Sequence, residues 1–200
     1  MESKQPHQDQ ESAHHPQRIR ERIAGESGGG DLADAVLGAI DGGITSFAVV
    51  AGAFGGGFSG LVIVVMGFAS LLADGFSMAA SNYLSTRSQQ DETEHARREE
   101  ERHIDQVPEG QREEIRQIFA DKGFEGEVLD RITETITSDR RLWADTVVTE
   151  ELGLPLEAGN PWRAGLATFV AFLLVGLIPL LPFLVPGLPL AHGFAASAVM

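Results

Sequence analysis

Three long apolar runs alternate with polar, charge-rich segments along this chain of 200 residues. The runs cover residues 35–54, 58–80 and 164–185. About 20 residues of helix span the hydrocarbon core of a bilayer, so each run predicts a transmembrane helix. The glycines at 55–57 predict a tight turn that makes the first two helices a hairpin. The last apolar piece, residues 190–200, is too short to cross, and we interpret it as the start of a fourth helix.

The segment between the second and third runs, residues 86–160, is polar but carries repeated helix signals. Pro108 predicts a helix start, and Gly123 and Gly153 predict helix ends. Apolar residues recur there at helical spacing, for example at Ile132 and Ile136. The pattern predicts a small helical bundle, into which the second membrane helix could continue without a break.

The predicted fold class is therefore an all-α membrane protein with an inserted helical domain. Residues 1–31 are expected to form a disordered polar tail, with a short helix around 18–24. Residues 32–85 are expected to hold membrane helices one and two. Residues 86–160 form the inserted acidic domain, and residues 161–200 hold helix three and the start of helix four.

Charge is strongly segregated along the chain. The formal net charge is -14, from 15 basic and 29 acidic residues, and the basic ones all lie outside the apolar runs. By the positive-inside rule, the tail and the inserted domain face the cytoplasm. The acidic balance argues against binding nucleic acid. Cysteine is absent, so any metal must be held by oxygen, nitrogen or thioether ligands.

Asp41 stands inside the first apolar run. A carboxylate at membrane depth is costly, and such residues commonly face a helix bundle interior and mark an ion or proton path. We therefore expect Asp41 to face the interior and bind a cation. The alternative is an Asp that only hydrogen-bonds a neighbouring helix.

Polar side chains form one stripe along the second apolar run. Within it, Met78 places a thioether among oxygen ligands, a mixture that suits Fe²⁺ better than Mg²⁺ or Ca²⁺. The alternative for Met78 is ordinary packing. The stripe consists of Asp74, Ser77, Met78, Ser81, Asn82 and Ser85.

The inserted domain offers further ligand types at helical spacing. Glu99 and Glu100 lie four and three residues before His103, and Gln111 lies three before Glu114. These spacings place two ligands on one helix face, as at Glu-x-x-His metal sites. Charge runs are more often solvated helix faces paired with arginines, and spacing alone favours that alternative.

Motifs for other chemistry are lacking in the sequence. It contains no phosphate-binding loop, no HExxH and no EF-hand loop, and it shows no Ser/His/Asp pattern. Nothing in it indicates an ATP-driven pump or a hydrolase, so we do not expect an enzyme.

Several segments resemble the vacuolar iron transporter family, which includes the yeast calcium cross-complementer type and many prokaryotic members. The resemblance implies an all-helical homodimer in the membrane that exports Fe²⁺ or Mn²⁺ from the cytoplasm in exchange for protons. It also implies a cytoplasmic metal-binding domain between the second and third membrane helices, and no resident cofactor. The segments are residues 38–47 (GAIDGGITSF), 71–84 (LLADGFSMAASNYL), 150–154 (EELGL), 160–163 (NPWR) and 177–183 (LIPLLPF).

The resemblance implies roles for individual residues. Asp41 and Met78 match the family's translocation-site Asp and Met. Glu100 and Glu114 match acidic ligands of its cytoplasmic domain, and Glu151 matches the acid of its Glu-Leu-Gly-Leu motif.

This chain departs from the family pattern at three ligand positions and in length. His103 and Gln111 stand where the family has glutamates, and Val147, which cannot ligate, stands where it has a methionine. The family has five membrane helices, so we expect a chain truncated at its C-terminus. A prokaryotic-type member implies an inner or plasma membrane location.

Two other functions stay open at this point. One is a membrane-anchored metal-binding fragment that does not transport. The other is a structural membrane protein whose acidic domain binds a basic partner.

Overall fold

The structure is a computed structural model that describes residues 15–16, 29–157 and 159–199. Across these residues the regular elements are all helical. The chain divides into two compact units: unit one comprises residues 1–84 and 159–200, and unit two comprises residues 85–158. The short helix predicted at 18–24 lies outside the described residues.

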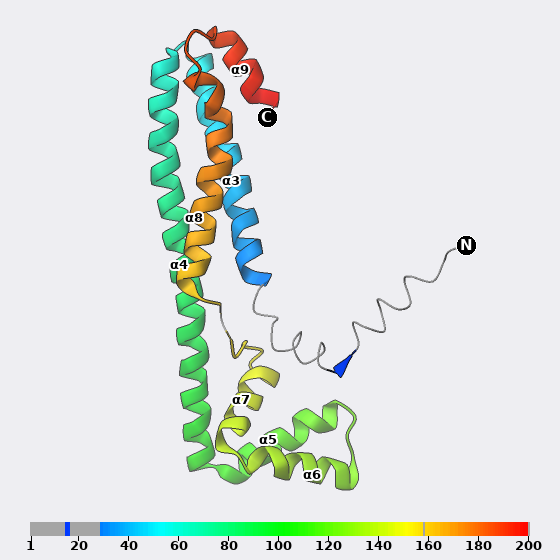
Figure 1. The fold of residues 1–200 in the computed structure, drawn as a ribbon. Coiled ribbons are helices and arrows are strands. Elements are labelled where there is room, and N and C mark those ends of the chain that lie inside the picture. The colour runs from blue at the N-terminus through cyan, green and yellow to red at the C-terminus, as the bar shows by residue number, and fades with distance from the viewer. Residues whose placement is uncertain (1–14, 17–28, 158, 200) are drawn as a thin grey trace, which may run out of the picture. The chain divides into compact units, whose positions relative to one another are not determined.

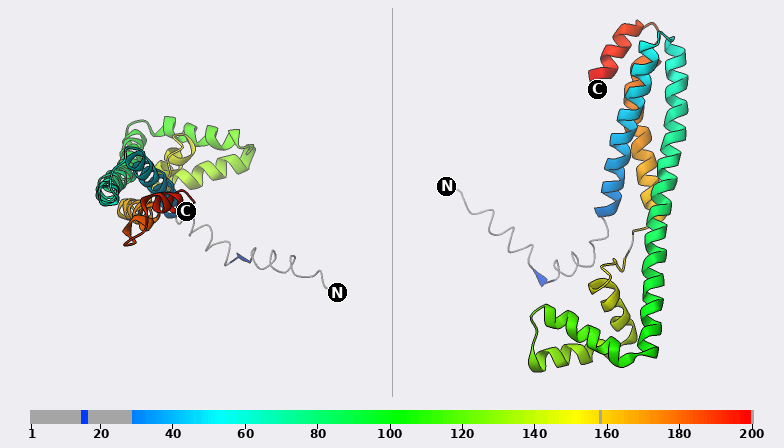
Figure 2. Two further views of the ribbon diagram at one scale, coloured as in Figure 1. Left: turned by 90° about the horizontal axis from the view of Figure 1, so that it is seen from above. Right: turned by 180° about the vertical axis from the view of Figure 1, so that it is seen from behind.

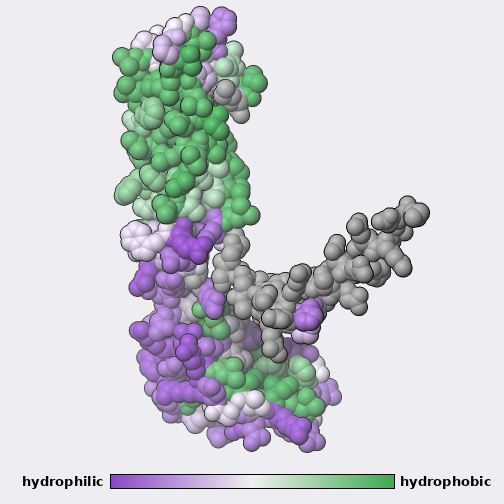
Figure 3. Space-filling model, in the orientation of Figure 1, coloured by the Kyte–Doolittle hydropathy of each residue, from purple (hydrophilic) through white to green (hydrophobic). Residues whose placement is uncertain are grey.

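Unit one is a group of apolar helices. Three helical stretches are long and apolar enough to cross a membrane, which confirms the three predicted spans. In Figures 1 and 2, α3, the first part of α4 and α8 run side by side, and Figure 3 shows apolar side chains over this surface. The elements are α3 (Gly29–Gly55), α4 (Gly60–Gln106), α8 (Pro161–Leu177), the 3₁₀ helix η2 (Ile178–Leu184) and α9 (Leu190–Val199).

The turn between α3 and α4 has the predicted glycine geometry. Gly57 has a φ of 72°, in the left-handed region that glycine enters without steric cost. The Phe58 N–H donates to the Ala53 carbonyl at 3.1 Å, and the Gly57 N–H donates to Phe54 at 3.0 Å. This Schellman pattern satisfies the last carbonyls of α3 and reverses the chain.

Prolines end the third apolar helix. Pro179 and Pro182 lie in η2, where the missing N–H groups make a regular α-helix unfavourable. The chain then turns and forms α9, in which Phe194 stacks on Phe54 with ring centroids 4.3 Å apart. The α9 helix has 10 residues, and its role as the start of a fourth membrane helix stays a prediction.

Backbone-to-backbone packing joins α3 to α8. A Cβ at Gly38 would overlap the Thr168 carbonyl oxygen, and one at Gly42 would overlap the Phe172 carbonyl oxygen. A Cβ at Gly176 would lie 2.8 Å from the Gly42 carbonyl oxygen. Small residues at four-residue spacing permit this close approach where burial of apolar surface cannot drive helix association.

Unit two contains the end of α4 and three short helices: α5 (Pro108–Asp121), α6 (Gly126–Thr137) and α7 (Arg140–Glu150). These helices pack on an apolar core of Ile104, Ile115, Ile136, Trp143, Ala144 and Val147. As the sequence suggested, α4 continues from unit one into unit two without a break. Apolar spacing also predicts Val128, Leu129, Leu142 and Trp143 on buried faces. Leu129 and Trp143 are buried, but Val128 and Leu142 are exposed, because adjacent residues differ by about 100° around a helix.

Candidate functional site

The predicted ligands of unit two gather around Glu114. The Gln111 side-chain amide donates to Glu114 Oε2 at 2.5 Å, one turn along α5. Glu100, His103 and Glu151 are close enough to act on the Glu114 carboxyl electrostatically. The structure thus joins Gln111 to Glu114 and places Glu100, His103 and Glu151, from α4 and the C-cap of α7, within electrostatic range of Glu114.

Two oxygens of this cluster are buried without hydrogen-bond partners. They are Glu100 Oε2 and the Gln111 side-chain oxygen Oε1. His103 Nδ1 lies 3.5 Å from Glu100 Oε2 without hydrogen-bond geometry. An unsatisfied buried acceptor costs free energy, more so when it is a carboxylate, so the cluster is suited to receive a cation.

Tertiary contacts hold the cluster in place. The Trp143 indole Nε1 donates to the Gln111 backbone carbonyl at 3.3 Å, which ties the start of α5 to α7. Trp143 and Ile115, which follows Glu114, both belong to the buried core. Glu100, His103, Gln111 and Glu114 thus stand on packed helices, and Glu151 stands at the C-cap of α7.

The electrostatics of the cluster disfavour negative charge at its centre. Burial raises the pKa of Glu114, and the nearby Glu151 and Glu100 carboxylates raise it further, against the opposing effect of His103. A divalent cation would relieve this repulsion. The donor types present are carboxylate, amide oxygen and imidazole, which suit borderline or hard divalent metals.

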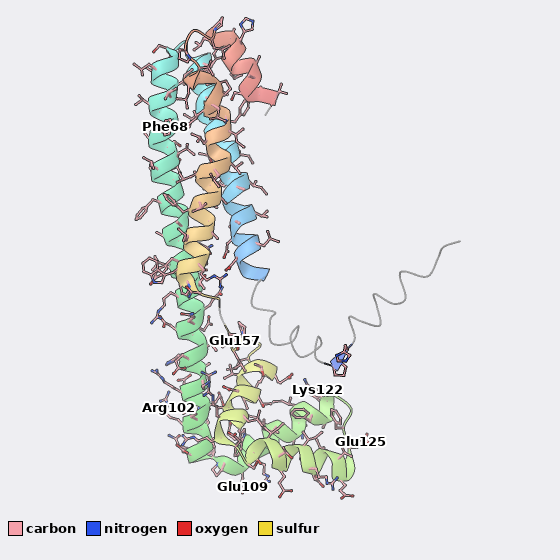
Figure 4. The ribbon with its side chains drawn as sticks, in the orientation of Figure 1. Phe68, Arg102, Glu109, Lys122, Glu125 and Glu157 are labelled. Carbon is pink, nitrogen blue, oxygen red and sulfur yellow. The ribbon has the colours of Figure 1, made fainter. Side chains whose placement is uncertain are left out.

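The remaining candidates of unit two behave differently. Glu99 turns to solvent, where it pairs with Arg102 at 3.1 Å and with His95 at 3.7 Å. Val147 is buried in the apolar core. Figure 4 shows Arg102 and Glu109 among the charged side chains that project from this unit. Within the described parts of the chain, no three His, Asp or Glu side chains already stand at metal-binding geometry.

In unit one, Asp41 lies on an exposed face of α3, not in the interior of the unit as expected. The physical reason is the glycine packing, because Gly42 and Ser46 face α8 and leave Asp41 about 100° around the helix. Ile40 and Ile44, also exposed, flank it. A carboxylate amid apolar surface requires a cover in the membrane.

Asp74 occupies the corresponding level of α4. Phe172 is fully buried between Gly42 and Gly75, the residues that follow Asp41 and Asp74. Asp74 is exposed, and Ser70 Oγ donates to its Oδ2 at 2.5 Å. Two carboxylates thus stand at one level of the unit, on different helices.

The polar stripe of α4 divides into two parts. Met78 packs against the apolar core around Phe172 and Leu71, as in its packing alternative. Asn82 donates to Thr168 Oγ1 of α8 at 2.8 Å. Ser77, Ser81 and Ser85 remain exposed.

Sequence reasoning missed Thr168 and the α3 glycines. Thr168 is fully buried, and its hydroxyl also donates to the Ala164 carbonyl at 3.0 Å. The available signal was the four-residue spacing of Gly38, Gly42 and Ser46, which is typical of close helix packing in membranes.

Comparison with known proteins gives consistent matches. A vacuolar iron transporter of Centaurea cyanus is 31% identical over 175 residues, covering 86% of this chain and 70% of that protein. One of Toxoplasma gondii is 32% identical, covering 82% of this chain and 55% of that protein. Vacuolar iron transporter 1 of Arabidopsis thaliana is 31% identical, covering 76% and 61%. This chain therefore spans only part of the length of these relatives.

The family assignment rests on most of the chain. Residues 32–200 match the VIT family, a range that contains Asp41, Asp74 and all of unit two. The three apolar helices agree with a membrane protein. This chain belongs to the VIT family.

Proposed function

We propose that the chain is a proton-coupled transporter that exports Fe²⁺ or Mn²⁺ from the cytoplasm, with unit two collecting the metal and Asp41 on the path through unit one. The relatives named as vacuolar iron transporters support iron as a substrate. The observation that carries the proposal is the pair of buried, unpartnered oxygens of Glu100 and Gln111 beside Glu114.

Unit two is proposed as the collecting site because its charge and burial favour cations. Residues 87–163 carry 20 acidic and 11 basic residues, so a negative field raises the local cation concentration. A metal bound at Glu100, Gln111 and Glu114 would satisfy the two orphan oxygens. His103 and Glu151, which act electrostatically on Glu114, are proposed to complete the ligand set.

Asp41 is proposed to exchange metal for protons. A carboxylate must lose its proton before it ligates a metal, so binding and proton release are coupled at one oxygen pair. Its exposed position on α3 supports a homodimer in which a second copy covers that face. Asp74, at the same level, is proposed as a second acidic group of the path.

Calorimetric titration of Mn²⁺ into the full chain in detergent tests the collecting site. Glu114→Gln should lower the affinity about tenfold or more, while keeping an acceptor for the Gln111 amide. The matched control is Glu113→Gln on the same helix, because Glu113 is exposed and accepts a hydrogen bond from the neighbouring Gln117 side chain. Equal affinities in the two variants would refute metal binding at Glu114.

A metal-binding protein without transport is the second candidate. It rests on the cluster of unit two alone, where Glu100 Oε2 and Gln111 Oε1 are buried without hydrogen-bond partners. Mn²⁺ binding without flux across a sealed bilayer would select it. Loss of binding altogether would favour a structural membrane protein with a basic partner.

A further inference from the structure

The two aromatic side chains Tyr83 and Trp162 form a contact at one end of unit one. Their ring centroids lie 4.8 Å apart, with the planes inclined by 57°. Trp162 is 75% exposed, although it is the larger apolar group of the pair. The transport proposal uses neither residue.

Each of the two residues stands at a boundary between apolar and charged sequence. Tyr83 closes the apolar part of α4, and the first charge after it is Arg87. Trp162 opens the apolar part of α8, and Arg163 beside it is the last charged residue of the chain. The same boundary occurs on α3, where Asp31 Oδ2 accepts from Arg163 Nη2 at 2.6 Å.

Local structure fixes where the aromatic pair points. The Asn160 side chain caps α8 and accepts from the N–H groups of Trp162 and Arg163 at 3.0 and 3.3 Å. Gly165 allows α4 to approach, since a Cβ there would lie 2.9 Å from the Ala79 carbonyl oxygen and 3.3 Å from Tyr83 Cβ. The exposed indole is therefore held on a capped helix start.

We propose that Tyr83 and Trp162 form a lipid-interface site that takes the headgroup and glycerol region of one leaflet and fixes the depth of unit one in the bilayer. Aromatic rings with one polar group favour this region, where the apolar body and the N–H or O–H are both accommodated. Trp162 is the second residue of the 17-residue apolar helix α8, and most of its ring surface is exposed. Packing within unit one therefore does not account for a large aromatic ring at this position.

The site implies a depth for the two carboxylates. Asp74 lies nine residues from Tyr83 along α4, and Asp41 lies ten residues from Asp31 along α3. At 1.5 Å per residue these separations are about 14 and 15 Å. Half of a hydrocarbon core is about 15 Å, so both carboxylates fall near the midplane.

Depth-dependent fluorescence quenching tests the position of the indole. The full chain would be reconstituted into phosphatidylcholine vesicles that carry a nitroxide either at the headgroup or deep in an acyl chain. The chain has two tryptophans, so Trp143→Phe leaves Trp162 as the only reporter, and Trp162→Phe is the matched control. In Trp143→Phe we expect the headgroup nitroxide to quench the fluorescence more strongly than the deep nitroxide. In Trp162→Phe, where Trp143 is the reporter, we expect little quenching by either nitroxide.

Two outcomes would overturn the interface site. Stronger quenching by the deep nitroxide would place Trp162 inside the hydrocarbon core. Quenching by aqueous iodide with no effect of either lipid nitroxide would make it a solvent- or protein-facing residue. Neither measurement involves metal, so either failure is separate from failure of the transport proposal.

A spin label tests whether the aromatic pair sets the depth. The chain has no cysteine, so Ile40→Cys provides a unique label position on the exposed face of α3. We expect the label near the bilayer midplane, and a shifted depth when Tyr83→Ala and Trp162→Ala are combined. An unchanged depth in that variant would show that other contacts fix the register of unit one.

Discussion

The two units handle acidic side chains in opposite ways. In unit one, Asp41 and Asp74 lie on exposed faces of apolar helices, at one level beside the buried Phe172. In unit two, Glu100 is buried in a polar domain with an oxygen that has no hydrogen-bond partner. Each arrangement leaves a carboxylate in an unfavourable environment, where a cation would stabilise it.

The difference follows from what holds each unit together. Unit one relies on glycines that let helix backbones touch, so side chains next to those glycines are pushed outward. Unit two relies on an apolar core and on ion pairs such as Arg97 with Asp145. Polar side chains such as Glu100 and Gln111 are drawn inward there because they stand on helices that pack on this core.

The glycine packing of unit one gives the largest expected effect. Gly42→Ala should destabilise the chain by about 2 kcal/mol or more, because its Cβ meets the Phe172 carbonyl oxygen and backbone must shift. Gly52→Ala on the same helix is the control, since its added Cβ would meet nothing within 4 Å beyond the adjoining residues and backbone of its own helix. Thermal unfolding in detergent measures both, and equal midpoints would contradict the close packing of α3 on α8.

The ion pairs of unit two should differ with burial. Arg97 and Asp145 are joined at 2.6 Å with side-chain exposures of 19% and 17%, whereas Arg87 and Asp91 are joined at 3.2 Å with 57% and 63%. Asp145→Ala should cost about 2 kcal/mol because it removes the more buried partner of the Arg97 guanidinium and leaves it with Glu94, a 45% exposed carboxylate at 3.1 Å. Asp91→Ala should cost about 0.5 kcal/mol or less. Chemical denaturation would measure both costs, and comparable values would show that burial does not govern these pairs.

The polar contact between α4 and α8 should contribute less. Thr168→Val keeps the shape of the side chain but removes the acceptor of the Asn82 amide at 2.8 Å. Interhelical hydrogen bonds in membranes are worth about 0.6 kcal/mol on average, so the loss should be of that order. Ser81→Ala, at an exposed neighbouring position, is the control. A stability change no larger than that of the control would remove Thr168 from the helix contact.

The smallest effect is a pH dependence of metal-free stability. Because the pKa of Glu114 is raised, its contribution to stability is present below its ordinary pKa and is lost as pH rises through the raised pKa. With metal removed by a chelator, the unfolding midpoint should therefore fall as pH rises from the ordinary pKa of a glutamate to the raised pKa of Glu114. Glu114→Gln should make this fall smaller. Metal affinity should change in the opposite direction, rising with pH as the carboxyl loses its proton. If the unfolding midpoint depended on pH in the same way in the parent chain and in Glu114→Gln, an electrostatic contribution of Glu114 to stability would be contradicted.

Much of the fold could be predicted because its signals are local. Hydropathy located the three apolar helices, and Pro108 and the glycines at 55–57 and 123 marked where helices begin or end. Helical spacing also put Gln111 and Glu114 on one face of α5, where the structure joins them.

What the sequence did not reveal depends on contacts between helices. The outward position of Asp41 follows from which face of α3 meets α8, and that face is set by fit to Thr168 and Phe172. Glu99 and Glu100 share the same spacing pattern, yet only Glu100 is buried, because α4 turns that one toward α5 and α7. Helical periodicity identifies the face of a helix on which a residue lies. It does not show which of several residues near that face is buried against another helix.

Metal flux into sealed proteoliposomes tests the transport function most directly. The full chain and Asp41→Asn would be compared with Mn²⁺ and Fe²⁺ under an imposed pH gradient, with Gly52→Ala as a variant that preserves packing. We expect gradient-dependent flux in the parent and in Gly52→Ala, and its loss in Asp41→Asn. Flux that is absent from all three, or that persists in Asp41→Asn, would contradict a metal path through Asp41.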